Sequence, residues 1–257
     1  MNIFKNLYNY RELIKTSVKK DIGGKYKHSF LGVLWSFINP LLQITVYAII
    51  FPLIIKNNIP NYTVFLVCGL IPWNYFSTVI NRASFTMIEN GNIIKKVYFP
   101  REILPLSLVT SETINFIISS LIILAFTIAY GMGITPYIFI YPIIVLVEYV
   151  LLSGISLIIS SVTVYFRDLQ HFVGVLLQLF FYATPIVYSI ETIPKNFRWI
   201  LKLNPMTYII EAFRDIFYNK TIPDIKVLGI ILILGVILCV GGYLLFNKLQ
   251  KRFAEEL

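Results

Sequence analysis

The chain has 257 residues, of which 57% are hydrophobic and 14% are charged, and its mean hydropathy is +0.75. Soluble domains carry charge on about a quarter of their residues, so this composition excludes an ordinary soluble enzyme and indicates an integral membrane protein. The net charge is +9, but in a membrane chain the positions of Lys and Arg matter more than their sum. We therefore expect no nucleic acid partner.

The first 20 residues favour an amphipathic helix and not a cleavable signal, because they lack a continuous apolar core. An apolar stripe recurs every three or four residues, and charged residues lie opposite it. The stripe is formed by Ile3, Leu7, Tyr10, Ile14 and Val18, and Lys5, Glu12 and Lys19 are opposite. We expect this helix to lie in the cytoplasmic membrane interface. A helix packed on protein is the alternative.

The stretch 25–42 joins this basic segment to the first apolar run. Lys27 and His28 mark the cytoplasmic boundary, Gly32 would let another backbone approach closely, and Trp35 would anchor at headgroup level. Asn39 is a polar residue within the apolar run, and boundary position does not explain it.

Six apolar runs are long enough to cross about 30 Å of hydrocarbon as helices. They lie at 34–55, 63–81, 104–130, 138–162, 171–190 and 227–247, with the turn GMGITP at 131–136 between the third and fourth. If both termini are cytoplasmic, 15 of the 22 Lys and Arg fall on the cytoplasmic side, as the positive-inside rule requires. The expected fold is an all-α integral membrane protein with six transmembrane helices.

We expect a single domain over 1–257. It would comprise an interface and gate region at 1–33, a six-span bundle at 34–247 and a cytoplasmic tail at 248–257.

The segment 184–220 follows the fifth run and has no stretch long enough to span. Pro185 must interrupt or end a helix, because proline has no amide hydrogen. The amphipathic stretches at 197–202 and 208–214 predict two short re-entrant helices. Their non-helical turns are tolerated at depth only when buried in protein or facing a water-filled cavity. An interfacial loop lying flat on the membrane is the alternative.

No motif supplies nucleotide or metal chemistry. The GGK at 23–25 lacks the earlier Gly and the following Ser or Thr of a phosphate-binding loop. Cys68 and Cys239 lie within apolar runs and are expected to pack as small hydrophobes. We expect no catalytic residue, no metal and no cofactor in this chain.

Glu112 and Glu148 are carboxylates within apolar runs, and such groups often mark ion or proton paths. Polar neighbours favour hydrogen-bonded structural pairing of Glu112, namely Thr110, Ser111, Thr113 and Asn115. A proton-coupled secondary transporter using Glu112 and Glu148 is one alternative, although no internal repeat accompanies it.

A second alternative is a membrane-embedded transferase acting on lipid-linked sugars, with Asp168 and His171 as acid and base. These two residues stand three apart on a loop, which is weak support for acid–base chemistry. An ion pair between Arg167 and Asp168 is the simpler interpretation.

Several motifs resemble those of one family. The first is Tyr26-Lys27, SFLG at 29–32, Trp35 and Pro40. The others are KKVYFPREILP at 95–105, YFRDL at 165–169, TPIVY at 184–188, Ile193-Pro194, LNPM at 203–206 and Phe213-Arg214. In this order they resemble the permease subunits of type-2 ATP-binding-cassette (ABC) exporters, which move O-antigen polysaccharide, teichoic acid and related glycans.

The resemblance implies an ATPase-coupling helix in the loop after the second run. Its residues would be Lys95, Lys96, Tyr98, Phe99, Pro100 and Arg101, with Tyr98 and Phe99 as an exposed aromatic pair that a partner's pocket would hold. It also implies a cytoplasmic gate at Tyr26, Lys27, His28, Gly32 and Trp35. The re-entrant pair would close the outer mouth, with hinges at Pro185, Tyr188, Pro194, Asn204 and Pro205.

Aromatic rings can offer the apolar faces of sugars a sliding surface. We expect channel lining from Phe37, Tyr47, Phe51, Phe180, Phe181 and Tyr182. The resemblance further implies a homodimer in the bacterial cytoplasmic membrane with two ATPase subunits, which would bind ATP and Mg. The cargo would be a lipid-linked polysaccharide.

Overall fold

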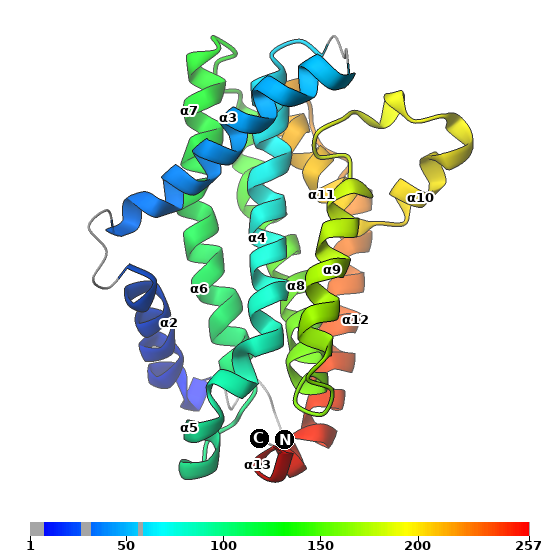
Figure 1. The fold of residues 1–257 in the computed structure, drawn as a ribbon. Coiled ribbons are helices and arrows are strands. Elements are labelled where there is room, and N and C mark those ends of the chain that lie inside the picture. The colour runs from blue at the N-terminus through cyan, green and yellow to red at the C-terminus, as the bar shows by residue number, and fades with distance from the viewer. Residues whose placement is uncertain (1–7, 27–31, 56–58, 257) are drawn as a thin grey trace.

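The computed structural model describes residues 8–26, 32–55 and 59–256, and this part of the chain is helical with no strand. Figure 1 shows an elongated bundle with α5 and α13 at one end. The helices are α2 (Arg11–Tyr26), α3 (Trp35–Ile55), α4 (Tyr62–Glu89), α5 (Gly91–Lys96), α6 (Ile103–Ser119), α7 (Leu121–Ala129), α8 (Tyr141–Val162), α9 (Leu169–Tyr182), α10 (Arg198–Lys202), α11 (Pro205–Arg214), α12 (Ile225–Leu249) and α13 (Phe253–Glu256).

Within the described residues, five helical stretches are long and apolar enough to cross a membrane. They are Trp35–Leu53, Tyr62–Glu89, Ile103–Ala129, Pro136–Val162 and Ile225–Arg252. The run expected at 171–190 is not one helix, because α9 ends at Tyr182 and the chain turns around Pro185. The 14 residues of α9 extend about 21 Å, which is shorter than the hydrocarbon core.

The second span is longer than its apolar run predicted. Hydropathy falls at Arg82, but no helix breaker occurs before the Asn90-Gly91 turn, and α4 continues to Glu89. Arg82, which follows the run predicted at 63–81, is therefore part of a helix that packs in the bundle.

Helices α8 and α12 pack closely because glycines line their contact. A Cβ at Gly154 would lie 2.6 Å from the backbone nitrogen of Cys239, and one at Gly235 would lie 2.9 Å from that of Leu151. Small residues of this kind let membrane helices approach, since packing replaces the hydrophobic effect in lipid.

Helix α4 is the central element and packs against α3, α6, α8, α9 and α11. Helix α3 crosses the bundle obliquely on its outside (Figure 1). Most of α3 is not covered by other helices, since Leu42, Ile49 and Leu53 are exposed. Its buried side is represented by Ile44.

Helix α2 packs along α6. Its half-buried residues include Leu13, Ile14 and Val18, and Lys15 and Lys19 are exposed. The described part of the predicted amphipathic helix thus packs on α6, and its place in the membrane interface stays a prediction. Ile3, Lys5 and Leu7 lie outside the described residues.

Candidate functional site

The predicted coupling segment lies beside α13, at one end of the bundle (Figure 1). Lys95, Lys96 and Tyr98 are exposed, and Tyr98 shows 96% of its surface. Phe99 is buried in a cluster with Phe253. The expected exposed aromatic pair is therefore wrong for Phe99. The two neighbouring rings differ because the backbone is extended after α5, and successive side chains of an extended segment point to opposite sides.

The carboxyl-terminal tail holds this coupling segment in place. Arg101 donates from Nη1 to the carbonyl oxygen of Gln250, and its guanidinium carbon lies 5.9 Å from the ring centroid of Phe253. The hydroxyl of Tyr165 donates to the carbonyl of Leu249 at 2.7 Å. Pro100 is half-buried. The coupling segment, the loop after α8 and the tail therefore pack as one unit.

The predicted cytoplasmic gate is described only in part. Tyr26 ends α2, but its side chain lies outside the described part of the chain, as do Lys27 and His28. Gly32 has φ +48°, and no described atom would lie within 4 Å of a Cβ there. The close backbone approach expected at Gly32 therefore stays a prediction, and glycine permits the left-handed backbone found at this position.

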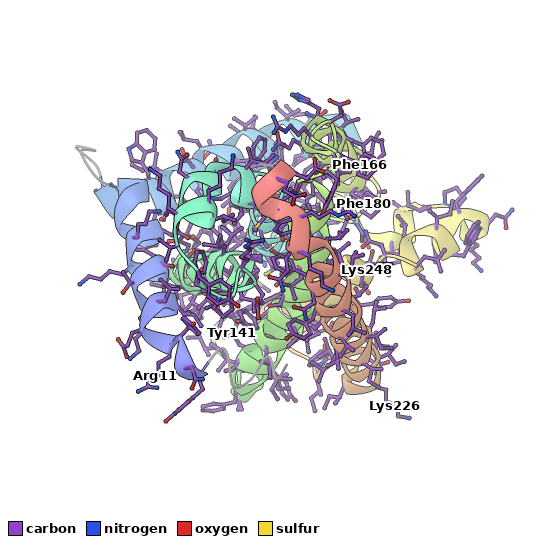
Figure 2. All side chains as sticks on the ribbon, turned by 90° about the horizontal axis from the view of Figure 1, so that it is seen from below. Arg11, Tyr141, Phe166, Phe180, Lys226 and Lys248 are labelled. Atoms are coloured by element: carbon purple, nitrogen blue, oxygen red, sulfur yellow. The ribbon has the colours of Figure 1, made fainter. Side chains whose placement is uncertain are left out.

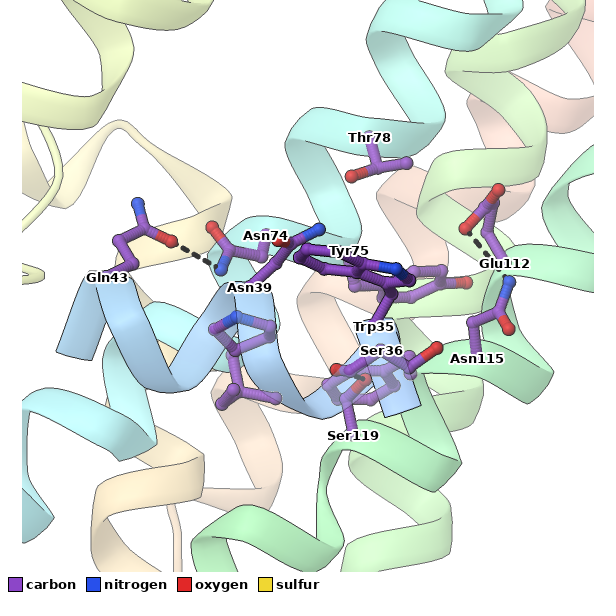
Figure 3. A pocket seen from close by; sticks show the side chains of 13 residues that line it. Trp35, Ser36, Asn39, Gln43, Asn74, Tyr75, Thr78, Glu112, Asn115 and Ser119 are labelled. Atoms are coloured by element: carbon purple, nitrogen blue, oxygen red, sulfur yellow. Dashed lines mark hydrogen bonds between the residues drawn. The ribbon is translucent and has the colours of Figure 1, made fainter. Parts of the chain in front are cut away.

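Trp35 begins α3 and lines a cavity of about 450 Å³ between α3, α4 and α6 (Figure 3). The lining also includes four amide side chains, from Asn39, Gln43, Asn74 and Asn115. The cavity explains why a polar residue such as Asn39 occurs in the apolar helix α3, because its amide side chain lines this polar cavity.

Glu112 is buried at the edge of this cavity and forms an ion pair with Arg82. Asn115 donates from Nδ2 to Glu112 Oε2 at 3.3 Å (Figure 3). The prediction of structural pairing is confirmed for Asn115. It is wrong for Thr110, Ser111 and Thr113, whose hydroxyls donate to backbone carbonyls of their own helix.

Glu148 on α8 is fully buried, and neither carboxylate oxygen has a hydrogen-bond partner in the described residues. Burying an ionised carboxylate without a partner is costly. The two intramembrane carboxylates therefore differ, since Glu112 has an ion-pair partner among the described residues and Glu148 has none there.

Two short helices are present where the amphipathic stretches predicted them. Helix α11 begins at Pro205, because Asn204 Oδ1 accepts a hydrogen bond from the Met206 amide at 3.0 Å. Asn204 Nδ2 also donates to Thr184 Oγ1 at 2.8 Å, which ties α11 to the turn containing Pro185.

Two other predicted hinges lie in the same loop. The hydroxyl of Tyr188 donates to the carbonyl of Tyr182 at 2.8 Å, and Pro194 precedes a single helical turn at 195–197.

The two helices differ in burial. Ile209 and Ile210 of α11 are fully buried, whereas Trp199 and Ile200 of α10 are exposed. In Figures 1 and 2 the segment carrying α10 projects away from the bundle. Helix α11 is thus part of the core, and α10 presents Trp199 and Ile200 outward while its Leu201 is buried.

Arg214 locks α11 to the bundle, a role that sequence reasoning did not assign. Arg214 is buried and donates from Nη2 to the Ile186 carbonyl at 2.8 Å. Its guanidinium carbon lies 3.5 Å from the ring centroid of Phe65. A Cβ at Gly69 would come within 3.0 Å of the same Nη2.

Some of the aromatic residues predicted to line the channel pack against one another, and others are exposed. The rings of Tyr47 and Phe181 lie 5.8 Å apart between α3 and α9, and Phe51 packs on Tyr47 at 5.3 Å. Phe180 and Tyr182 are exposed. None of the six predicted aromatics, Phe37 included, lines the described cavity, and their channel role stays a prediction.

Asp168 and His171 are exposed near the start of α9. Arg167 donates to the carbonyl of Glu256 at 3.2 Å, and the expected ion pair with Asp168 is absent from the described residues. The transferase alternative gains no support from this arrangement.

Residues 12–218 match the family of ABC-2 type transporters. The whole chain is similar to the O-antigen export system permease protein RfbA of Klebsiella pneumoniae, at 41% identity over 98% of this chain and 97% of the relative. It is also similar to the RfbA protein of Myxococcus xanthus, at 34% identity over 100% of both. The polysialic acid transport protein KpsM of Escherichia coli is 25% identical over 75% of this chain and 74% of the relative.

Proposed function

The chain belongs to the ABC-2 type transporter family, and from this premise we propose that it is the permease of an O-antigen export system. It moves a lipid-linked polysaccharide, such as O-antigen, teichoic acid or a related surface glycan, outward across the bacterial cytoplasmic membrane. The observation that carries the proposal is the similarity over nearly the full length of both chains to O-antigen export permeases. The permease is not itself an enzyme, and ATP is hydrolysed by a separate subunit.

The finer assembly extends this proposal. Two copies of the chain pair and bind two ATPase subunits, which hold ATP and Mg. The uncovered face of α3 supports pairing, because a second copy would cover it. The exposed Lys95, Lys96 and Tyr98 support ATPase docking at the α5 end of the bundle.

The membrane arrangement is also part of the proposal. The chain is one domain over 1–257, with α9 and the turn after it completing a sixth crossing and with both termini cytoplasmic. Residues 1–33 form the gate region and 248–257 the tail. The outer mouth is closed by α10 and α11, and the excess of Lys and Arg on the cytoplasmic side supports this orientation.

An export assay tests the function. The chain is expressed with its ATPase in cells that make the lipid-linked glycan, and surface glycan is measured with an antibody. We expect surface glycan with the active ATPase, and intracellular glycan when the phosphate-binding Lys of the ATPase is replaced. Export without the ATPase, abolished by a protonophore, would instead favour the proton-coupled transporter.

A further inference from the structure

The cavity between α3, α4 and α6 has the chemistry of a carbohydrate site, and we propose that it binds one neutral sugar residue of the exported glycan. The inference rests on the proposed function, because the glycan is the expected source of the sugar. A volume of about 450 Å³ falls within the range of small-ligand pockets, about 300–1,000 Å³.

The lining offers both kinds of hydrogen-bonding group that sugar hydroxyls need. Amides donate and accept, and so does a hydroxyl such as that of Thr78. Figure 3 shows the amides of Asn39, Asn74 and Asn115 near the indole of Trp35. An aromatic ring among amides suits a sugar, which has apolar CH faces as well as hydroxyls.

The site is held in shape by contacts that need no ligand. Asn74 Nδ2 donates to Gln43 Oε1 at 2.9 Å, and each of these amides keeps further donor or acceptor capacity. The ring of Tyr75 stacks on Phe116 at 4.7 Å, and its hydroxyl bonds Thr113 at 2.7 Å. Such pre-organisation reduces the entropy lost on binding.

Charge favours a neutral ligand over a phosphate. Among the described residues that line the cavity, Glu112 is the one with a charged side chain, and it is paired with Arg82. Phosphate groups are recognised by Arg or Lys forks or by lysine point charges, and the lining supplies neither. The cavity therefore suits the sugar part of a lipid-linked glycan better than its phosphate part.

A second cavity lies next to the first, towards α5. Its volume is about 470 Å³, and Lys20, Arg82 and Asn90 belong to its lining. Since Arg82 lines this cavity and pairs with Glu112 of the first, the ion pair separates two polar spaces along α4. A sugar would reach the proposed site from the α5 end once this pair separates.

Tryptophan fluorescence tests the site directly. The chain has three Trp, so Trp73→Phe with Trp199→Phe leaves Trp35 as the reporter in full-length protein in phosphatidylcholine nanodiscs. The probes are the methyl glycosides of glucose, galactose, mannose, rhamnose and N-acetylglucosamine, with glucuronate and pyrophosphate as charged comparators. We expect a saturable emission change with at least one neutral glycoside.

Variants locate the binding. Adding Asn115→Leu or Thr78→Val should weaken the response about tenfold, because each removes a hydrogen-bonding group from the lining. Asn81→Leu is the matched control, since Asn81 is exposed on α4 and outside the lining. No response to any neutral glycoside, a response to pyrophosphate alone, or equal responses in all variants would overturn the proposal.

The export assay separates the two proposals. Asn115→Leu and Thr78→Val should lower surface glycan severalfold while ATPase association stays normal, and Asn81→Leu should not. Wild-type export in both variants would reject the sugar site and leave the permease function standing. No export by the wild-type chain with its ATPase would reject the function itself, whatever the binding result.

Discussion

The partner of Glu112 shows how a single charge is accommodated in the bundle. Arg82 and Glu112 stand on neighbouring helices, and the Glu112 side chain is 4% exposed against 33% for Arg82. Removing one partner of a buried pair leaves a charge without compensation, whereas replacing both can be nearly neutral. The pair should therefore behave as a unit in mutational experiments.

Glu112→Gln is expected to lower the free energy of unfolding by about 2 kcal/mol, less than for a fully buried pair because Arg82 is partly solvated. Adding Arg82→Gln should recover about half of this loss. Thermal unfolding of the four proteins in nanodiscs gives the double-mutant cycle. Additive losses from the two substitutions would mean that the ion pair contributes nothing.

Tyr98 and Phe99 are adjacent but have different surroundings. Phe99→Ala should cost roughly 3–5 kcal/mol of stability, because it removes a ring from the cluster with Phe246 and Phe253. Tyr98→Ala should leave stability unchanged and reduce ATPase pull-down, since this exposed ring is free to enter a partner's pocket. Normal pull-down with Tyr98→Ala would exclude Tyr98 as an anchor.

At the scale of the helix, the contact between α8 and α12 depends on glycine. Gly154→Ala should lower the yield of folded protein severalfold, because its Cβ would meet the backbone of α12 at 2.6 Å. Gly241→Ala on α12 is the matched control, with open space around the added methyl group. The measurement is the monodisperse fraction after extraction, and equal fractions for both variants would refute the close contact.

Helix boundaries show how far the sequence alone could predict this fold. Apolar runs located five long helices, but hydropathy ended the second run at Arg82 although α4 continues. The fifth predicted run extends past Pro185, although the missing amide hydrogen of this proline signals a break in the helix. Hydropathy reports solvent preference, whereas helix ends depend on breakers and caps such as Asn204.

The candidate site was less accessible to sequence reasoning than the helices were. The cavity joins Trp35, Asn74 and Glu112 from three helices, and no spacing along the chain reveals that they meet. Asn39 was the available signal, because a polar residue in an apolar run needs a polar surrounding. The pairing of Arg82 with Glu112 could have been sought as opposite charges at similar depth on antiparallel helices.

For the whole molecule, the structure divides the segment after α9 into a fixed part and an outward part. Helix α11 is fixed by Arg214 and by the Asn204 cap, so it cannot move without breaking buried contacts. Helix α10 is tied less closely, through a hydrogen bond from the Thr207 hydroxyl to the Leu201 carbonyl at 2.8 Å, and its Trp199 and Ile200 side chains are exposed while Leu201 is buried. If this region closes the outer mouth during transport, α10 is the part that moves.

Cysteine labelling of the assembled exporter tests this division. In a variant with Cys68 and Cys239 replaced, Trp199→Cys, Ile200→Cys and Leu203→Cys should react with a membrane-impermeant thiol reagent from outside. Their rates should change severalfold when ATP is trapped on the ATPase, because α10 would exchange surroundings as the mouth opens. Ile209→Cys and Ile210→Cys should stay unreactive in both states, since those positions are buried in the core. Rates at α10 that ignore nucleotide, or labelling at 209 and 210 equal to that at 199, would show that the outer mouth opens elsewhere.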